Sequence, residues 1–316
     1  MKEYTEKIRE TAKSLLKEGK VDIFIGYRKG TVPMMNEPFA VSDPDKTDLL
    51  YWDSNCGMNL CNYLTKRTDR IGIIANGCNS RNIVTHIIEN QIKREQLYIL
   101  GIPCTGMIDP RAVRRAVKYR EITDVEESNG RVIVKGDGFE ETFEKKDVLQ
   151  KNCAECLHRN PVIYDELVAE KVPEQEGIET FRDVKKIEAM GSDERWGFFT
   201  RMISSCIRCY ACRNACPLCY CTTCFVDEAQ PQWVGKSNDP TDTMTFHILR
   251  AFHCAGRCTD CGACERACPM GINVRQFTKK LNKDALELFS WEAGMREDRR
   301  PPMDVYKVDD YNDFIR

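Results

Sequence analysis

The cysteines of this chain carry its most informative chemistry. The sequence contains 18 of them, and two stretches repeat the spacing C-x2-C-x2-C-x3-C-P. This run is the bacterial ferredoxin pattern, in which the fourth cysteine ligates the other cluster. Thiolates are soft ligands that suit iron–sulfur clusters. The two copies contain Cys206, Cys209, Cys212 and Cys216 before Pro217, and Cys258, Cys261, Cys264 and Cys268 before Pro269.

The repeated pattern predicts two 4Fe-4S clusters with crossed ligands. Structural zinc is the alternative, but it usually shows paired C-x2-C ligands at longer separation. Because each cluster receives four thiolates, neither has an iron open to a substrate, and we expect this region to move electrons. Cluster one takes Cys206, Cys209, Cys212 and Cys268, and cluster two takes Cys258, Cys261, Cys264 and Cys216.

Four further cysteines flank the two motifs: Cys219, Cys221, Cys224 and Cys254. Their clustering predicts a fourth metal site, either another iron–sulfur cluster or a structural zinc. The alternative is that some are small buried apolar residues beside the clusters. His253, next to Cys254, is a candidate ligand of the same site.

Composition restricts the class of protein. The net charge is −2 and the isoelectric point about 6.2, which gives no basic footprint for nucleic acid. No apolar run approaches the ~18–20 residues of a membrane span, and the charged N-terminus does not resemble a secretory signal. We therefore expect a cytoplasmic protein, where clustered cysteines are metal ligands and not disulfides.

The first half of the chain reads as an α/β domain with a mixed sheet. Apolar residues at helical spacing predict a helix over residues 2–18, and "VDIFIGY" predicts a strand over 21–27. Residues 71–102 have the pattern of a strand–helix–strand crossover with two buried parallel strands. Residues 121–136 predict a hairpin around the Asn-Gly turn at 129–130.

The second half predicts a helical dicluster domain, which makes the whole chain α+β. We expect helices over 193–205, over 239–254 with a cap near Thr241 or Asp242, and from about 274. The acidic stretch 165–190 and the charged tail are candidate docking surfaces. The expected divisions are 1–160 for the α/β domain, 161–195 for a connector, 196–290 for the dicluster domain and 291–316 for the tail.

Four segments of the first half occur together: "VDIFIGYRKG", "IIANGCNSRN", "ILGIPCTGMID" and "KNCAECLHRNP". In that order they resemble the beta-subunit family of deazaflavin-reducing hydrogenase and formate dehydrogenase, here with a dicluster ferredoxin domain fused after it. In the hydrogenase subunit the ferredoxin-like segment comes first. The resemblance implies an iron–sulfur flavoprotein, with FAD in the α/β domain and a 4Fe-4S cluster close by.

The resemblance also implies ligands for this third cluster. Carried over position by position, Cys104, Cys153 and Cys156 are three of them. Cys78, in "NGCNSR", is our choice for the fourth. Cys56 and Cys61 are the alternatives.

The flavin site is predicted less directly. No G-x-G-x-x-G follows a strand, but two turns combine glycine with a cation, and one of them opens a helix whose N-terminus would favour a phosphate. An ordinary loop is the alternative for each, and Cys78 stands where a flavin contact would otherwise lie. The candidate residues are Gly26, Arg28, Lys29 and Gly30 in one turn and Gly77, Asn79, Ser80 and Arg81 in the other.

These features predict an electron-transfer subunit of a multi-subunit anaerobic redox complex. The catalytic partner would be a formate dehydrogenase, hydrogenase or heterodisulfide-reductase-like subunit, since no catalytic constellation stands out in this sequence. One alternative is a self-contained flavin reductase that takes electrons from soluble ferredoxin. Another is an assembly or binding protein whose clusters are structural.

Overall fold

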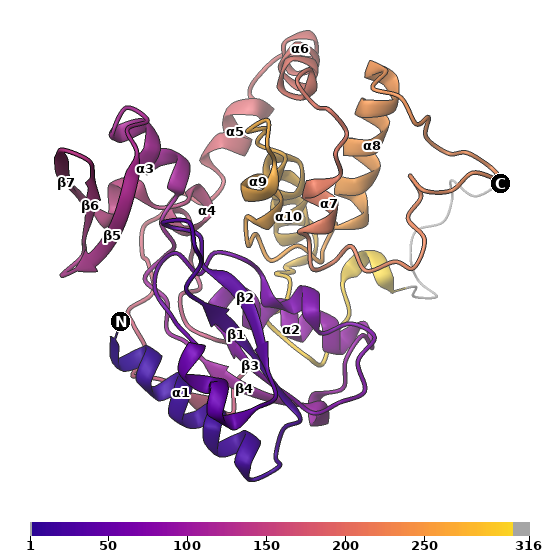
Figure 1. Ribbon diagram of the computed structural model, residues 1–316. Coiled ribbons are helices and arrows are strands. Elements are labelled where there is room, and N and C mark those ends of the chain that lie inside the picture. The colour runs from indigo at the N-terminus through magenta and orange to yellow at the C-terminus, as the bar shows by residue number, and fades with distance from the viewer. Residues whose placement is uncertain (1, 306–316) are drawn as a thin grey trace.

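The computed structural model describes residues 2–305, and its N-terminal half is built on a five-stranded sheet (Figure 1). The strand order is β2-β1-β3-β4-β8, in which only β2 is antiparallel to its neighbour. The predicted mixed sheet is confirmed. The strands are β1 (Ile23–Arg28), β2 (Glu37–Val41), β3 (Ile71–Ala75), β4 (Leu97–Gly101) and β8 (Glu166–Leu167).

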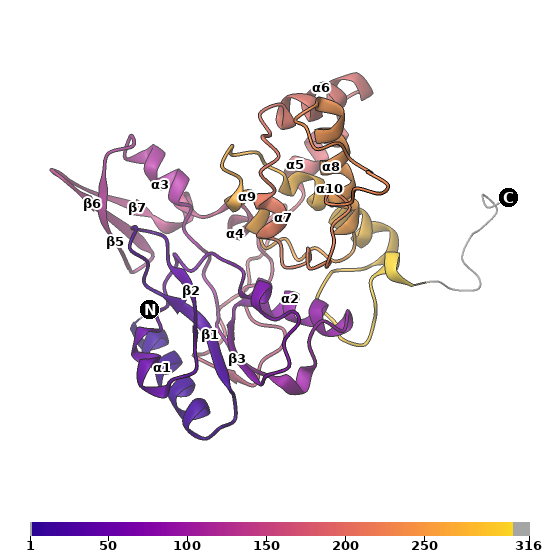
Figure 2. The same cartoon turned by 45° about the vertical axis from the view of Figure 1, so that its right-hand side comes forward.

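Two helices cover this sheet, which lies between them in both ribbon views (Figures 1 and 2). Helix α1 (Lys2–Lys17) buries Ile8, Ala12 and Leu15, as its apolar spacing predicts. Helix α2 (Gly77–Ile88) follows β3 directly, and β3 is buried along its whole length. The predicted crossover of β3, α2 and β4 is therefore confirmed, and it places the N-terminus of α2 at the carboxyl edge of the sheet.

A second, smaller sheet stands apart from the first (Figure 2). Strands β5 (Ile122–Ser128), β6 (Arg131–Gly136) and β7 (Phe139–Glu144) are antiparallel and share a core with α3 (Pro110–Ala116). The predicted hairpin is confirmed: Asn129 and Gly130 have φ of 50° and 75°, the left-handed pair of a tight turn. The third strand, β7, was not predicted.

The second half is helical, as predicted. Its helices surround the two ferredoxin motifs, and the short α7 and α9 each lie within one motif. The predicted cap of α8 is wrong, because Asp239 caps it by accepting from the Thr241 amide. The helices are α5 (Arg182–Glu188), α6 (Ser192–Ile203), α7 (Ala211–Asn214), α8 (Pro240–His253), α9 (Ala263–Ala267) and α10 (Arg275–Phe289).

The segments expected to link or follow the domains pack back onto them. Strand β8 completes the main sheet from within the predicted connector. After α10 the chain returns to α2, where Trp291 and Ala293 are buried. The rest of the predicted tail, residues 306–316, lies outside the described residues. Within residues 2–305, no helix is long and apolar enough to cross a membrane.

Candidate metal centres and the path between them

The four predicted ligands of cluster one lie around one small cavity of about 20 Å³. Its other walls are largely apolar and include Phe246, Ile272 and Val274. Cys268 thus joins the three cysteines of the first motif although more than 50 residues separate them in the sequence. The cysteines that line the cavity are Cys206, Cys209, Cys212 and Cys268.

The backbone of each motif forms a matching cradle. Arg208 and Tyr210 in the first motif, and Asp260 and Gly262 in the second, all have left-handed φ between 49° and 72°. The amides of Arg208 and Asp260 donate to the sulfurs of Cys206 and Cys258, each at 3.4 Å. A loop that turns its amides toward sulfur atoms fits the thiolate-bound cubane that the spacing predicts.

His247 adds a side-chain contact to cluster one. Its Nε2 lies 3.3 Å from the Cys206 sulfur. Burial, with Arg250 and Arg208 nearby, lowers the pKa of His247 to about 4. The ring is therefore neutral at physiological pH and can donate one N–H to the thiolate, a kind of bond that tunes cluster potentials.

Cluster two is less simply arranged. Cys258, Cys261 and Cys264 follow the cradle of the second motif. The predicted fourth ligand, Cys216, instead has its sulfur in a compact group with those of Cys219 and Cys254, all within 4.8 Å of one another. Cys216 thus belongs to cluster two by motif and to a thiol trio by position.

The predicted fourth metal site is only partly assembled. Cys219 and Cys254 meet in the trio, whereas Cys221 is exposed. Cys224 packs in the apolar cluster around Phe246. His253 is outside the trio and packs edge-on against Phe225, so it is not placed as a ligand.

The predicted third-cluster ligands line a larger cavity of about 130 Å³ at the carboxyl edge of the main sheet. Cys104 follows β4 and accepts the Gly106 amide at 3.3 Å. Cys153 lies in the short helix α4 (Lys151–Ala154) and accepts the Met107 amide at 3.4 Å. All four predicted ligands are on its walls: Cys78, Cys104, Cys153 and Cys156.

The thiols of this cavity are protonated when no metal holds them. Burial, reinforced by neighbouring cysteines, raises the pKa of Cys104 to about 12 and that of Cys156 to about 11. Iron must displace these protons, so binding will be coupled to proton release. Cys78, at the start of α2, also benefits from the positive end of the helix dipole once it is a thiolate.

The two alternatives to Cys78 are engaged elsewhere. The Cys61 sulfur is buried and donates to the Asn79 carbonyl at 3.2 Å. Cys56 does line the cavity, but its sulfur accepts from the Asn36 amide group at 3.3 Å. Cys78 also makes a hydrogen bond, to Oδ1 of Asn76 at 3.2 Å, and it lines the cavity as Cys56 does, so Cys78 stays the predicted fourth ligand and Cys56 its alternative.

The same cavity reaches the dicluster domain. Cys258 and Cys261 line it together with Cys56 and the four predicted ligands of the third cluster. Ligands of two predicted clusters, from different halves of the chain, therefore face one space.

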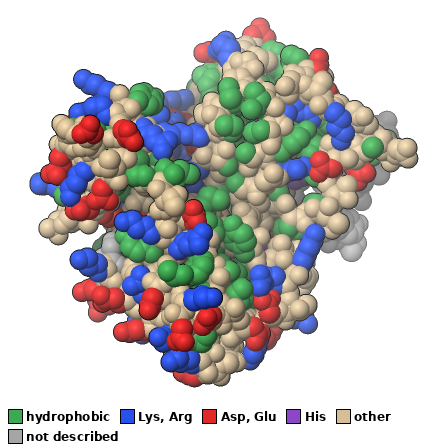
Figure 3. All heavy atoms as spheres, in the orientation of Figure 1, with side chains coloured by type: hydrophobic (Ala, Val, Ile, Leu, Met, Phe, Trp, Pro, Cys, Tyr) green, Lys and Arg blue, Asp and Glu red, His purple; other side chains and the backbone are tan. Residues whose placement is uncertain are grey.

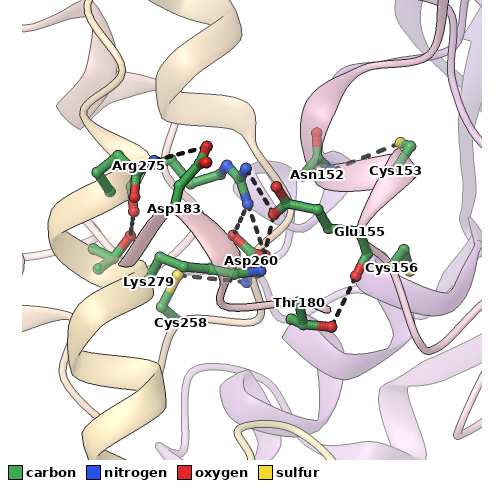
Figure 4. Close-up of polar contacts among 12 residues, drawn as sticks. Asn152, Cys153, Glu155, Cys156, Thr180, Asp183, Cys258, Asp260, Arg275 and Lys279 are labelled. Atoms are coloured by element: carbon green, nitrogen blue, oxygen red, sulfur yellow. Dashed lines mark hydrogen bonds and ion pairs between the residues drawn. The ribbon is translucent and has the colours of Figure 1, made fainter. Parts of the chain in front are cut away.

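Buried cations of α10 bind the two halves together at this point (Figure 4). Arg275 contacts Asp260 of the second motif at 2.9 Å and Glu155 of the Cys153–Cys156 loop at 3.1 Å. Lys279 pairs with the same two carboxylates. Burial would raise the pKa of Asp260, but Arg275 and Lys279 outweigh it and hold that pKa below its usual value. Asp260 therefore stays charged, and the ion pairs of Arg275 and Lys279 fix the loop of the second motif and the Cys153–Cys156 loop to one helix.

Arg250 on α8 is a buried cation of another kind. It is 4% exposed, its Nη2 donates to the Cys212 carbonyl at 3.0 Å, and its Nε has no hydrogen-bond partner in the part of the chain that the structure describes. A buried charge is costly unless an opposite charge compensates it. Anionic clusters on both sides would do so, which fits the predicted metal groups. The ionisable groups that act on it are the thiols of Cys212, Cys216, Cys254 and Cys264.

The donors of the predicted flavin turn at α2 are already used. Ser80 donates its hydroxyl to the Gly77 carbonyl at 2.8 Å, and Arg81 donates to the Ala293 carbonyl at 2.7–2.9 Å. A Cβ on Gly77 would lie 2.1 Å from the His158 carbonyl oxygen, so backbone covers this turn closely. Asn79 donates its amide to the side chain of Asn76.

The other predicted flavin turn is no more open. Arg28 pairs with Glu37, and Gly26 is buried in β1. A Cβ on Gly30 would lie 1.8 Å from the Met35 carbonyl oxygen, while Lys29 is exposed. Of the eight predicted residues, Gly77, Asn79 and Arg81 line the larger cavity, so a flavin phosphate at the α2 turn stays a prediction.

Several contacts at the centres were beyond prediction from the sequence. Gln175, in the expected docking stretch, donates to the carbonyls of Cys153 and Cys156 and so covers the third centre. His86 is buried and hydrogen-bonds the Pro217 carbonyl at 2.8 Å. Nothing in the local pattern signals either contact, since each joins residues distant in the sequence or outside a motif.

Comparison with known proteins identifies the domain in the second half of this chain. Residues 202–272 match the family of 4Fe-4S dicluster domains. Iron–sulfur clusters in the C-terminal half are thereby confirmed. The helices α7 to α9 and both cysteine motifs lie within or close to this match.

The particular relatives are beta subunits of F420-dependent formate dehydrogenase. The subunit of Methanocaldococcus jannaschii is 23% identical, with 79% of each chain covered. Subunit 1 beta of Methanococcus maripaludis is 24% identical, covering 92% of this chain and 90% of its own. The resemblance predicted from the four N-terminal segments is confirmed.

Among solved structures, a chain of the F420-reducing [NiFe] hydrogenase complex from Methanosarcina barkeri is similar with a TM-score of 0.39 and 17% identity. The match covers 50% of this chain and 63% of that one. The relatives and the dicluster domain together support an iron–sulfur electron-transfer subunit of a redox complex over a self-contained reductase or an assembly protein.

Proposed function

We propose that this chain relays electrons through three 4Fe-4S clusters between a catalytic subunit and a second redox site. The observation that carries the proposal is the cavity shared by Cys78, Cys104, Cys153 and Cys156 with Cys258 and Cys261. It joins the third cluster to cluster two, and the crossed ferredoxin motifs join cluster two to cluster one. The path therefore runs from the junction of the two halves into the dicluster domain.

The chain's own residues hold and tune these clusters. Thiolates fix each cluster, the amides of the cradles and His247 donate to the sulfurs, and Arg250 supplies positive charge between clusters one and two. When bound, the clusters supply one-electron redox chemistry. The path that we propose runs through the clusters alone and includes neither a flavin nor a zinc ion.

Cluster one is the end at which we expect the catalytic subunit to bind. Cys209 is exposed, and Ile207 and Met270 beside it are about half exposed. Figure 3 shows hydrophobic side chains gathered over the helical half, while charged side chains dominate the face of the α/β half. A small apolar surface around an exposed ligand permits close approach of a partner's redox centre. By analogy with the relatives' names, the partner is a formate dehydrogenase catalytic subunit.

The test uses the complex purified anaerobically through a tag on this chain. We expect a stoichiometric catalytic subunit, and we expect formate to reduce the clusters to the extent that dithionite does. Clusters that dithionite reduces but formate leaves oxidised in such a complex would contradict the proposed partner.

A matched pair of variants tests the docking end. Ile207→Glu places a charge beside cluster one and should slow formate-dependent reduction by about tenfold or more. Leu288→Glu changes an exposed residue of α10. It serves as the control and should leave the rate unchanged. Equal rates in both variants would place the partner elsewhere.

A further inference from the structure

The thiol trio contains two cysteines that no cluster needs. Cys216 is claimed by cluster two through the ferredoxin motif. Its neighbours Cys219 and Cys254 lie with their sulfurs within 4.8 Å of it and of each other. Cys254 is almost fully buried and Cys219 largely so.

A single metal ion does not account for the trio. A closed structural zinc site takes four ligands, and among the described residues the group offers three. One of these three, Cys216, also completes cluster two. Simple packing would not require sulfur atoms to meet.

We propose that Cys219 and Cys254 form a redox-active thiol pair that exchanges electrons with the clusters through contact with the cluster ligand Cys216. This rests on the proposed relay function. In the oxidising direction the two S–H bonds break and one S–S bond forms. Two protons leave, and two electrons reduce two oxidised clusters, one electron each. The reverse step consumes two electrons and two protons.

A surface hollow is lined by the sequence neighbours of both thiols, and we take it as the exit for those protons. Tyr220 follows Cys219 and His253 precedes Cys254, and both line a surface hollow of about 380 Å³. Arg257 and Glu89 stand in the same hollow and bond each other and Tyr220. Each cysteine of the pair is therefore adjacent in the sequence to a residue that lines this hollow.

The pair would store two electrons next to carriers that hold one each. Such a store is useful in a subunit that connects a two-electron catalyst to one-electron clusters, because the pair can accept both electrons of one turnover before the clusters pass them on. Cys221 and Cys224 are left outside this chemistry, one exposed and the other packed near Phe246.

The first experiment maps thiols in the full-length chain, purified anaerobically with its clusters. Samples are poised oxidised with ferricyanide or reduced with dithionite, denatured in acid with an alkylating agent, and analysed by peptide mass spectrometry. We expect a Cys219–Cys254 disulfide in the oxidised sample and both residues alkylated in the reduced one. Free thiols in both samples, or a disulfide between other cysteines, would overturn the proposal.

The second experiment counts electrons. Coulometric titration of the wild-type chain should take up about two electrons beyond one per cluster. Cys219→Ser and Cys254→Ser should lose those two and keep their iron, while the matched control Cys221→Ser should lose neither. About one zinc per chain that disappears in Cys219→Ser would show a metal site instead. Because iron content and cluster spectra are read separately, failure here is distinguishable from failure of the relay.

Discussion

A single buried charge, Arg250, is expected to set the potentials of the two ferredoxin-type clusters. Its guanidinium has no carboxylate partner among residues 2–305 and faces thiols of both motifs. Positive charge favours the reduced, more negative cluster. We predict that Arg250→Gln lowers both potentials by roughly 60 mV, a tenfold change for a one-electron couple.

Potentiometric titration followed by EPR measures this shift. Arg250→Lys keeps the charge and should retain most of the wild-type potential, although it loses the planar fork. If Arg250→Gln left both potentials unchanged with full iron content, the guanidinium would not face the clusters.

The ligands themselves were the most predictable residues. Spacing within a motif is local, so Cys206, Cys209 and Cys212 can be assigned from the sequence with no knowledge of the fold. The position of Cys216 beside Cys254 could not be predicted from the sequence, because it depends on how α8 packs against the first motif. The same holds for Arg250, which looks like any other arginine in the sequence.

At the scale of elements, Gly262 allows the loop of the second ferredoxin motif to pack closely against the α/β half. Its φ is +72°, and a Cβ there would lie 2.4 Å from Oδ1 of Asn152, next to Cys153. Gly262→Ala should therefore lower the free energy of unfolding by about 3 kcal/mol and reduce iron content. Gly130→Ala, at a similar φ of +75° in an open hairpin turn, should cost only about 1 kcal/mol.

Chemical denaturation of both variants separates steric overlap from backbone strain. Equal losses would mean that the loop does not press against Asn152 and that the two halves meet less closely than described.

The buried ion pairs that Arg275 and Lys279 of α10 make with Asp260 and Glu155, here called the α10 clamp, give a second prediction at this scale. Arg275→Met removes the buried partner of Glu265 and one of the two buried cations that Asp260 and Glu155 share with Lys279, and it should destabilise the protein by about 3 kcal/mol. Lys280→Met on the same helix removes a cation that is 44% exposed and should cost less than about 1 kcal/mol. Thermal unfolding under anaerobic conditions compares them. A similar Tm in both variants would argue against the clamp.

Helices and strands with long apolar repeats were predicted correctly, whereas short elements without such a repeat were not. Helix α1 and the crossover β3-α2-β4 have clear apolar repeats. The two-residue strand β8 has no pattern of its own and forms only because the edge of β4 is available. The cap of α8 was misplaced because Asp239 and Asp242 are both good cap residues, and Pro240 at the first turn selects the former.

At the scale of the whole molecule, the two halves should depend on iron to different degrees. The main sheet has a large core that is mostly aliphatic, whereas the predicted ligands Cys212 and Cys268 are two of the seven buried residues in the small core around Phe246 of the dicluster domain. Anaerobic removal of iron by a chelator should therefore abolish amide protection across residues 202–272 while β1, β3 and β4 stay protected.

Hydrogen exchange with mass spectrometry reads both regions in one sample. Loss of protection in the sheet together with the helices would show that the halves unfold as one unit. Full protection of the helices without iron would show that the clusters are not structural there.

The arrangement of the halves was the least predictable feature. The sequence indicates an α/β domain and a dicluster domain, but not that Arg275 and Glu155, 120 residues apart, hold them together. Nor does it indicate that segment 291–294 covers the turn that resembles a phosphate site. Both facts arise from tertiary packing, which no local sequence pattern reports.

The most direct test of the three-cluster relay is quantitation of iron and sulfide in the anaerobically purified chain and in two variants. The wild type should contain about twelve irons. Cys104→Ser should contain about eight, with the ferredoxin-type EPR signals intact, and Cys56→Ser should keep all twelve. About eight irons in the wild type, or no loss in Cys104→Ser, would contradict the account.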